Sequence, residues 1–334
     1  MAECSDWSLL HAKVHRTLRS RCLLPRDQRI LVAVSGGQDS LCLIKLLLDL
    51  QSKWQWHLGI AHCNHQWRSD AAANATYVAQ LAQAWNTPFY SETTDRVLRS
   101  EAAARQWRYQ VLSAIAQKHQ YKYIVTGHTA SDRAETLLYN LIRGSGADGL
   151  QSLTWYRALT PEIGLVRPLL EVTREETAQF CQDMQLQVWE DSTNQDLKYA
   201  RNRIRQELIP YLHQFNPKVE QTLAQTAEIF HAEVEYLESA AAQLQQNATI
   251  TNDDATVKLD CLILRNAPLA LQRRVIRRVL QQTLQTAPSF AQIEKIITLI
   301  TAPNCSQTDP LPGGAIAQIK QNCLWIYSSR VEEK

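Results

Sequence analysis

The chain has 334 residues, of which 45% are hydrophobic and 20% are charged. This length favours two domains, and the composition provides enough apolar surface for a packed core and excludes a disordered chain. The formal net charge is only +2, so a nucleic-acid-binding surface would have to come from local clusters of basic residues.

The first part of the chain alternates short apolar runs with longer amphipathic ones. The apolar runs are typical of buried strands, and they lie at 30–34, 57–61, from 89 onward and at 123–126. The amphipathic runs predict the helices that follow these strands, at 41–50, 70–85, 101–118 and 132–143. This alternation is typical of a parallel sheet covered on both faces. We therefore expect a doubly wound, Rossmann-like α/β domain that binds ligands at the carboxyl ends of its strands.

The pattern changes after Asn216-Pro217. Helical periodicity then predicts three helices, at about 218–246, 262–282 and 290–300. Two short apolar runs at 315–319 and 324–327 predict a terminal hairpin. We therefore predict an α/β domain at 1–215 and a second, mainly helical domain with a short hairpin at 216–334.

The cysteines and the hydropathy of the chain indicate the cellular compartment of the protein. The eight cysteines are scattered and form no Cys-x-x-Cys pair, which argues against a zinc ribbon or a cysteine-bound cluster. Several lie in apolar runs, as expected for buried thiols in a reducing compartment. The sequence shows neither a signal-peptide pattern nor a run of 18 apolar residues. We therefore expect a soluble, cytoplasmic protein that does not enter a membrane.

A glycine-rich segment, Ser35-Gly36-Gly37-Gln38-Asp39-Ser40, lies between the first predicted strand and the first predicted helix. Paired glycines let the backbone turn tightly, so that its N–H groups and the helix start can bind an anion. The segment lacks the Gly-Lys-Ser/Thr ending of a Walker loop. A carboxylate at Asp39 among phosphates indicates Mg²⁺ between them. The alternative is a simple turn with Asp39 as a helix N-terminal carboxylate, but all six residues together favour a nucleotide site.

A second group of polar residues follows the fourth predicted strand. Asp132 and Glu135 lie three apart at a predicted helix start, so their carboxylates point the same way, and His128 precedes them. Two carboxylates beside an anion site indicate recognition of a cation, either Mg²⁺ or an ammonium group. The alternative is a capped helix with Ser131 or Asp132 as N-cap. His128, just beyond the strand, favours the functional interpretation.

Two groups of arginines in the first predicted domain are candidates for phosphate contacts, because a guanidinium binds phosphate bidentately. Arg105 lies four residues after Glu101, a spacing that an ordinary helical salt bridge explains equally well. Arg201 and Arg205 share one helix face after the polar turn at 191–194. A solvated basic face is the alternative for this second pair.

A third group of arginines lies in the second predicted domain, at positions 273, 274, 277 and 278. Helical spacing puts them on one broad face and puts apolar residues, including Val275 and Leu280, on the other. Such density on a nearly neutral chain favours an RNA-binding patch over an unoccupied charged face.

Taken together and in this order, the motifs resemble the tRNA(Ile)-lysidine synthetase family of the ATP-pyrophosphatase (PP-loop) superfamily. Residues 35–40 match the superfamily's SGGxDS loop, and 62–68 is similar to the family's HxNHxLR segment, with Trp67 where leucine is usual. Further family segments are matched at 101–109, 127–136, 141–146, 167–169 and 191–205. The sequence departs from the family at 151–153. It also ends at 334, whereas longer members carry a further C-terminal domain that helps bind tRNA.

The resemblance implies the family's reaction. ATP adenylates C2 of the wobble cytidine in a CAU-anticodon tRNA(Ile) with release of pyrophosphate, and the ε-amine of free L-lysine then displaces AMP to form lysidine. By position, the resemblance implies an ATP site at Ser35, Gly36, Gly37, Gln38, Asp39 and Ser40, with Asp39 also binding Mg²⁺.

The resemblance also implies roles for other candidate residues. Asp132 and Glu135 would meet the substrate lysine, and either carboxylate could accept its proton. Arg105 and Arg201 would contact the reacting groups, and His128 would lie beside the phosphates or the lysine.

Other interpretations of the sequence remain open. A related tRNA thiolation enzyme is the nearest rival, although the absence of Cys-x-x-Cys pairs and the presence of Asp132 with Glu135 argue against it. A catalytically silent, ATP-gated RNA-binding module would bind tRNA without lysine-dependent release of pyrophosphate. The oligomeric state is open, a homodimer included.

Overall fold

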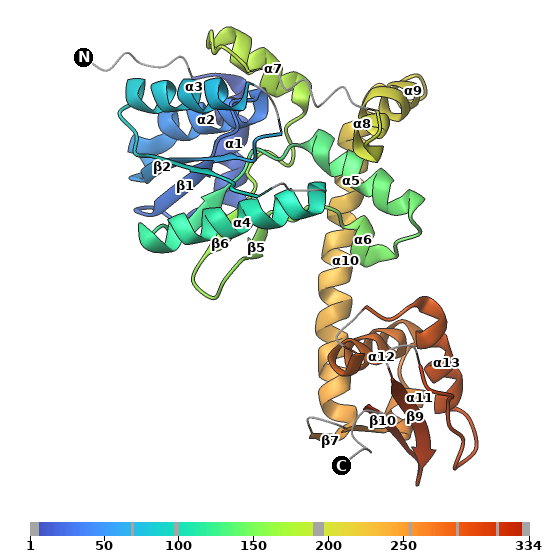
Figure 1. The fold of residues 1–334 in the computed structure, drawn as a ribbon. Coiled ribbons are helices and arrows are strands. Elements are labelled where there is room, and N and C mark those ends of the chain that lie inside the picture. The colour runs from blue at the N-terminus through green and yellow to red at the C-terminus, as the bar shows by residue number, and fades with distance from the viewer. Residues whose placement is uncertain are drawn as a thin grey trace. The chain divides into compact units, whose positions relative to one another are not determined.

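The computed structural model describes residues 7–67, 70–96, 100–189, 197–253, 256–284, 287–311 and 314–328. Its contacts divide the chain into two compact units, Met1–His231 and Ala232–Lys334 (Figure 1). The boundary falls inside helix α10 (Val219–Ala248), whereas the boundary expected from composition lies just before this helix. The domain boundary at 215 therefore stays a prediction. In the described ranges, no helix combines the length and the apolar character needed to span a bilayer.

The first unit contains a six-stranded sheet in the order β3-β2-β1-β4-β6-β5. The strands share short, mostly apolar sequences and have these bounds: β1 Arg29–Ala33, β2 His57–Asn64, β3 Phe89–Thr93, β4 Tyr123–Val125, β5 Tyr156–Ala158 and β6 Gly164–Val166. All neighbours pair in parallel except β5, which is antiparallel to β6. The predicted parallel sheet is confirmed for its first four strands, and the sequence analysis missed β6 and the short edge strand β5.

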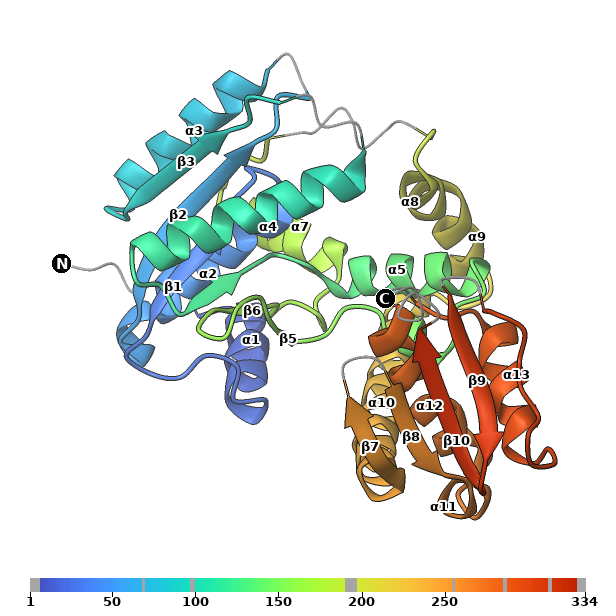
Figure 2. The same cartoon turned by 60° about the horizontal axis from the view of Figure 1, so that its bottom comes forward.

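Helices cover both faces of this sheet, as its alternating side chains require. Ile30 and Val32 of β1 pack into one core, while Leu31 between them packs into another. The first core contains α1 (Leu9–Ser20), α2 (Gln38–Trp54), α3 (Ala71–Ala84) and α7 (Arg174–Asp183). The second core contains α4 (Glu101–Lys118), which crosses its face of the sheet in Figure 2. The doubly wound α/β fold is therefore confirmed.

In the described residues before α10, the first unit contains five further helical segments: α5 (Ala130–Ile142), α6 (Ala147–Leu150), α8 (Ala200–Arg203), the π-helical segment η2 (Ile204–Leu208) and α9 (Ile209–His213). A small apolar cluster joins α5 to the last two through Leu138, Ile204 and Ile209. Because Ile204 is buried in that cluster, the neighbouring Arg205 is held close to α5.

The second unit packs helices against a four-stranded antiparallel sheet in the order β7-β8-β10-β9 (Figure 2). Its elements after α10 are β7 (Thr249–Asp253), β8 (Thr256–Asp260), α11 (Cys261–Arg265), α12 (Leu269–Leu284), α13 (Phe290–Ile300), β9 (Ala315–Lys320) and β10 (Cys323–Ser328). The predicted hairpin is confirmed as β9 and β10, but the sequence analysis missed β7 and β8. The single helix expected at 262–282 is in fact two helices, α11 and α12. Pro268 lies between them, where a proline ends regular helical hydrogen bonding.

The arginines of α12 make internal ion pairs. Arg274, Arg277 and Arg278 all pair with Glu238 of α10. The arginine at 273 pairs with a carboxylate of α13 at 2.7 Å, and the opposite, apolar face of α12 is buried as expected. These side chains hold α12 to its neighbouring helices, a structural role that the sequence analysis missed. Three guanidiniums on one carboxylate still leave a positive surplus, so RNA contact at this face stays a prediction.

Candidate functional site

A pocket of about 670 Å³ lies at the carboxyl ends of β1, β2 and β4. Its wall includes residues of the three loops that follow these strands, within 35–40, 63–67 and 126–128, and further side chains such as Trp189 and Arg205. Parallel α/β sheets bind their ligands at this edge. The pocket therefore lies where the sequence analysis expects a ligand.

The glycine loop between β1 and α2 is held in a fixed shape. Gly36 has φ +89°, and a side chain there would also overlap the amide of Asn74. The backbone N–H of Trp189 donates to the carbonyl of Gly36 at 3.0 Å, and Asn74 Nδ2 donates to the carbonyl of Ser35 at 2.9 Å. Ser40 Oγ accepts from the Ser35 N–H at 3.1 Å. The loop carbonyls are thus engaged by the surrounding protein.

The backbone N–H groups of the same loop differ from its carbonyls in their hydrogen bonding. Within the described residues, no group accepts a hydrogen bond from the backbone N–H of Gly36, Gln38 or Asp39. Gly37 is the N-cap of α2 and has no side chain to cap the helix. A helix start with available N–H groups attracts anions. The loop therefore has the geometry of a phosphate cradle.

Gly127 brings the end of β4 against this loop. A Cβ atom at Gly127 would lie 2.7 Å from the carbonyl oxygen of Asp39 and 2.9 Å from its carbonyl carbon. Both are backbone atoms that cannot move aside easily, so only glycine fits. This close approach sets His128 and the start of α5 beside the glycine loop.

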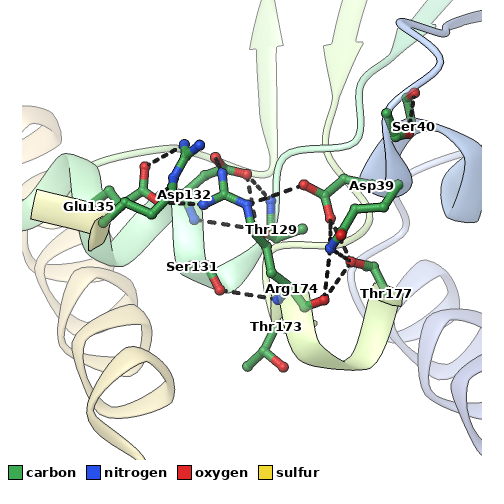
Figure 3. Close-up of polar contacts among 12 residues, drawn as sticks. Asp39, Ser40, Thr129, Ser131, Asp132, Glu135, Thr173, Arg174 and Thr177 are labelled. Carbon is green, nitrogen blue, oxygen red and sulfur yellow. Dashed lines mark hydrogen bonds and ion pairs between the residues drawn. The ribbon is translucent and has the colours of Figure 1, made fainter. Parts of the chain in front are cut away.

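Three carboxylates from different parts of the chain converge on Arg174, the first residue of α7 (Figure 3). Its Nε lies 3.3 Å from Asp39 Oδ2, and its Nη2 lies 2.5 Å from Asp132 Oδ1. Its Nη1 donates to Glu135 Oε1. The acidic residues predicted for Mg²⁺ and for lysine are therefore brought together, but an arginine that the sequence analysis did not name lies among them.

Asp132 and Glu135 have different surroundings. Asp132 lines the pocket, and its Oδ2 accepts from the N–H and the hydroxyl of Thr129 at 2.8 and 2.9 Å, which closes a capping box. Glu135 is buried, and it also accepts from Arg205 Nε and Nη2 at 2.8 and 3.0 Å. Glu135 is not among the residues of the pocket wall. Asp132 is the carboxylate that a bound molecule can reach.

Burial and charge act on these acids in opposite ways. Burial raises the pKa of Asp39 above its usual range, and Arg174 offsets this only in part. Burial also raises the pKa of Asp132, but Arg174, His128 and the hydrogen bonds from Thr129 bring its pKa below the usual range. The Arg174 guanidinium is partly buried, and the three carboxylates raise its pKa. At neutral pH, Asp132 is therefore a carboxylate and Arg174 a cation.

His128 lines the pocket, and its Nδ1 shares a hydrogen bond of 2.8 Å with Thr126 Oγ1. Burial lowers the pKa of His128 to about 3, and the positive charges of Arg167, Arg108 and Arg105 add to this effect. The imidazole is therefore neutral at physiological pH, so it can serve as a hydrogen-bonding neighbour but not as a cation for phosphate.

The lowered pKa of His128 predicts a pH-dependent stability difference. An unfolded histidine gains a proton as the pH falls below about 6.5, whereas folded His128 does so only near 3. The native state therefore loses stability relative to the unfolded state as the pH falls from about 6.5 towards 4. The variant His128→Gln has no imidazole to titrate and should not lose stability in this way. In thermal unfolding, the stability of the wild type relative to the variant should therefore fall as the pH falls from about 6.5 to 4. A constant difference between the two proteins from pH 7 to pH 4 would contradict the assignment.

The two predicted arginines are not in the pocket wall. Neither Arg105 nor Arg201 belongs to it, whereas Arg108 and Arg205, one turn further along each helix, do. The polar turn at 191–194 lies outside the described residues, as does Arg68. Arg174 carried a signal that went unused: Thr173-Arg174-Glu175-Glu176 matches the capping-box pattern, which marks a helix start.

Comparison with protein families matches residues 10–212 to a PP-loop domain and residues 259–325 to a TilS substrate binding domain. A tRNA(Ile)-lysidine synthase of a Nostoc species is 63% identical, with 98% of this chain and 99% of that protein covered. Its counterpart from a Synechocystis species is 50% identical, with 97% of this chain and 99% of that protein covered. The chain belongs to the tRNA(Ile)-lysidine synthase family.

The family resemblance inferred from the motifs is thus confirmed. The PP-loop match contains every residue of the pocket wall. The substrate-binding match begins within β8 and ends within β10 of the second unit. Among solved structures, a U34-tRNA thiolase of Methanococcus maripaludis has the same fold, with a TM-score of 0.57 at 15% identity over 66% of this chain and 77% of that one.

Proposed function

We propose that the chain is a ligase that uses ATP to attach lysine to the wobble cytidine of a CAU-anticodon tRNA(Ile), which forms lysidine. The family assignment supports the substrates, since the relatives over the full length are named tRNA(Ile)-lysidine synthases. The single structural observation that carries the proposal is the pocket in which Asp132 lies beside the phosphate cradle of the glycine loop. The reaction needs an anion site and an ammonium site within reach of one another.

The first half of the proposed reaction uses the glycine loop. The N–H groups of Gly36, Gln38 and Asp39 bind the pyrophosphate end of ATP, and hydrogen bonds of Ser35 and Ser40 hold the loop in shape. The cytidine O2 attacks the α-phosphorus, the bond to the β-phosphate oxygen breaks, and pyrophosphate leaves. The N–H groups stabilise the charge that builds up on the leaving group.

Asp39 fits a magnesium ion that arrives with ATP. Its carboxylate lies in the pocket wall beside the cradle. Burial raises the pKa of Asp39 despite Arg174, so a further cation there would stabilise the charged carboxylate. In the described residues, no group of three His, Cys, Asp or Glu side chains could hold a metal ion by itself. In proteins, Mg²⁺ is commonly bound by one or two carboxylates together with substrate phosphates, and it offsets the negative charge of those phosphates.

The second half of the proposed reaction uses the acids of α5. The ε-ammonium of lysine pairs with Asp132 and loses a proton to it, and the free amine attacks C2 of the cytidine. The C2–O2 bond then breaks, and AMP leaves with that oxygen. We propose that Glu135 is a positioning residue, because it holds Arg174 and Arg205 in place through ion pairs and does not line the pocket. Arg105 and Arg201 stay proposals for contacts with the RNA or the adenylate.

The test is a direct assay of the wild-type chain with ATP, Mg²⁺, labelled lysine and a CAU-anticodon tRNA. The expected result is label in the RNA, with one AMP and one pyrophosphate released for each lysine attached. Binding of tRNA without lysine-dependent release of pyrophosphate would instead identify a silent RNA-binding module. We propose a cytoplasmic location on the same grounds, since the tRNA and free lysine are found there.

A further inference from the structure

A second part of the pocket wall is basic. Arg108 and Tyr109 of α4 line the pocket. The guanidinium of Arg157 lies 5.0 Å from the centre of the Tyr109 ring, and that of Arg105 lies 5.7 Å from it. Arg167, just beyond β6, lies close enough to Tyr109 to lower the pKa of its phenol, and its Nη1 donates to the carbonyl of Thr154 at 2.6 Å. These five residues, from three separate parts of the chain, are called the Tyr109 cluster below.

The Tyr109 cluster carries a surplus of positive charge. Within the described residues, none of its four arginines forms an ion pair with a carboxylate. The arginines of α12, in contrast, all have acidic partners. Guanidiniums that gather without carboxylates repel one another, and an anion relieves that repulsion.

The residues of the Tyr109 cluster differ in how far they are buried. Arg108 and Arg157 are exposed, and Arg105 and Tyr109 are half-buried. Arg167 is only 2% exposed, and its Nε has no hydrogen-bond partner in the described part of the chain. Arg167 is therefore the buried cation of the cluster, whereas the guanidiniums of Arg108 and Arg157 are accessible to a molecule at the surface.

Neighbouring groups respond to this positive charge. Burial raises the pKa of Tyr109, but Arg167 and Arg105 outweigh it and bring the pKa below the usual range. Burial lowers the pKa of Arg167, and Arg157 and Arg105 lower it further. The shifts agree with the geometry, in which the Arg105 and Arg157 guanidiniums lie over the Tyr109 ring.

We propose that the Tyr109 cluster is a second anion subsite, separate from the glycine loop, that binds a phosphate group through Arg108 and Arg157. A phosphodiester of the RNA beside the target nucleotide is the expected source. Arg108 and Arg157 are exposed, so they suit a polymer that extends beyond the pocket, whereas the glycine loop already provides for the tail of ATP. Because two guanidiniums lie against the Tyr109 ring, the cluster suits a phosphate better than the stacking of a base.

This subsite adds an RNA contact to the proposed function, and the identity of the RNA rests on that proposed function. It assigns to exposed residues of α4 and β5 a task that the motifs had given to Arg105 and Arg201. Arg105 then acts from inside the cluster by holding the Tyr109 ring and adding positive charge.

The test is a binding titration of a CAU anticodon stem-loop RNA without ATP or lysine, at several salt concentrations. The variants are Arg108→Gln, Arg157→Gln and the double variant. The double variant should lose roughly tenfold or more in affinity. The slope of log affinity against log salt should fall by about 0.7 for each phosphate contact removed. Both positions are exposed, so the variants should fold, which thermal unfolding checks.

Arg29→Gln is the matched control. Arg29 is exposed and lies 5.2 Å from the centre of the Tyr121 ring, but it begins β1, at the opposite end of that strand from the pocket. It should leave RNA affinity unchanged.

A parallel titration with ATP separates the two sources of phosphate. A loss of RNA affinity with unchanged ATP affinity assigns the subsite to the RNA backbone. A loss confined to ATP assigns it to a nucleotide phosphate, and no loss in either titration overturns the proposal. Failure of the wild-type chain to incorporate lysine would overturn the proposed function instead, and it would leave these titrations unaffected.

Discussion

Asp132→Asn is expected to lower lysine incorporation into tRNA by roughly 10²–10⁴-fold while ATP affinity changes by less than about twofold. Asparagine has no charge to attract the ε-ammonium and cannot accept its proton. The helix start should survive, because the asparagine oxygen can still accept from Thr129 as Asp132 Oδ2 does. The glycine loop and its N–H groups are untouched. The measurement is single-turnover transfer of labelled lysine, with ATP affinity determined separately.

Asp183→Asn is the matched control for this variant. Asp183 is an exposed acid at the end of α7, and it accepts a side-chain hydrogen bond from Gln179 at 2.8 Å. The same chemical change there should leave lysine transfer unchanged. If Asp132→Asn transferred lysine at the wild-type rate, the cation-binding role of Asp132 would be wrong, and the ammonium would have to bind elsewhere in the pocket.

The sequence was most informative where local chemistry decides the structure. The bounds of α4 and α13 agree with the predicted helices at 101–118 and 290–300, because Ser100 and Ser289 cap them. The glycine loop was found because its conformation depends on its own residues. Gly36 has a positive φ that other residues adopt only under strain.

The sequence was least informative where contacts join distant segments. Arg174 meets Asp39 and Asp132 across 135 and 42 residues of chain, and no periodicity shows such a contact. The same holds for β8, which pairs with β10 more than 60 positions later, and β7 joins the sheet only through β8. The ion pairs of the α12 arginines were missed for this reason, since Glu238 lies on another helix.

Arg174→Met is expected to destabilise the first unit by roughly 3 kcal/mol or more, because it leaves carboxylates of low exposure without their common cation. Asp39 and Asp132 side chains are 21% and 19% exposed, and Glu135 is 3% exposed. Methionine fills similar space, and the contacts made by the Arg174 backbone with Ser131 and Gln38 are kept. The loss measured by denaturant unfolding therefore reports on the guanidinium.

Mg²⁺ provides an independent readout for the same variant. If Arg174 neutralises Asp39 and Asp132, a divalent cation should restore part of the lost stability of Arg174→Met in the absence of ATP, and it should do little for the wild-type chain. Lys13→Met is the control, because Lys13 pairs with Glu176 of the same helix but is 33% exposed, so that pair should contribute under about 1 kcal/mol. Equal losses in the two variants, with no response to Mg²⁺, would show that the three carboxylates do not depend on Arg174.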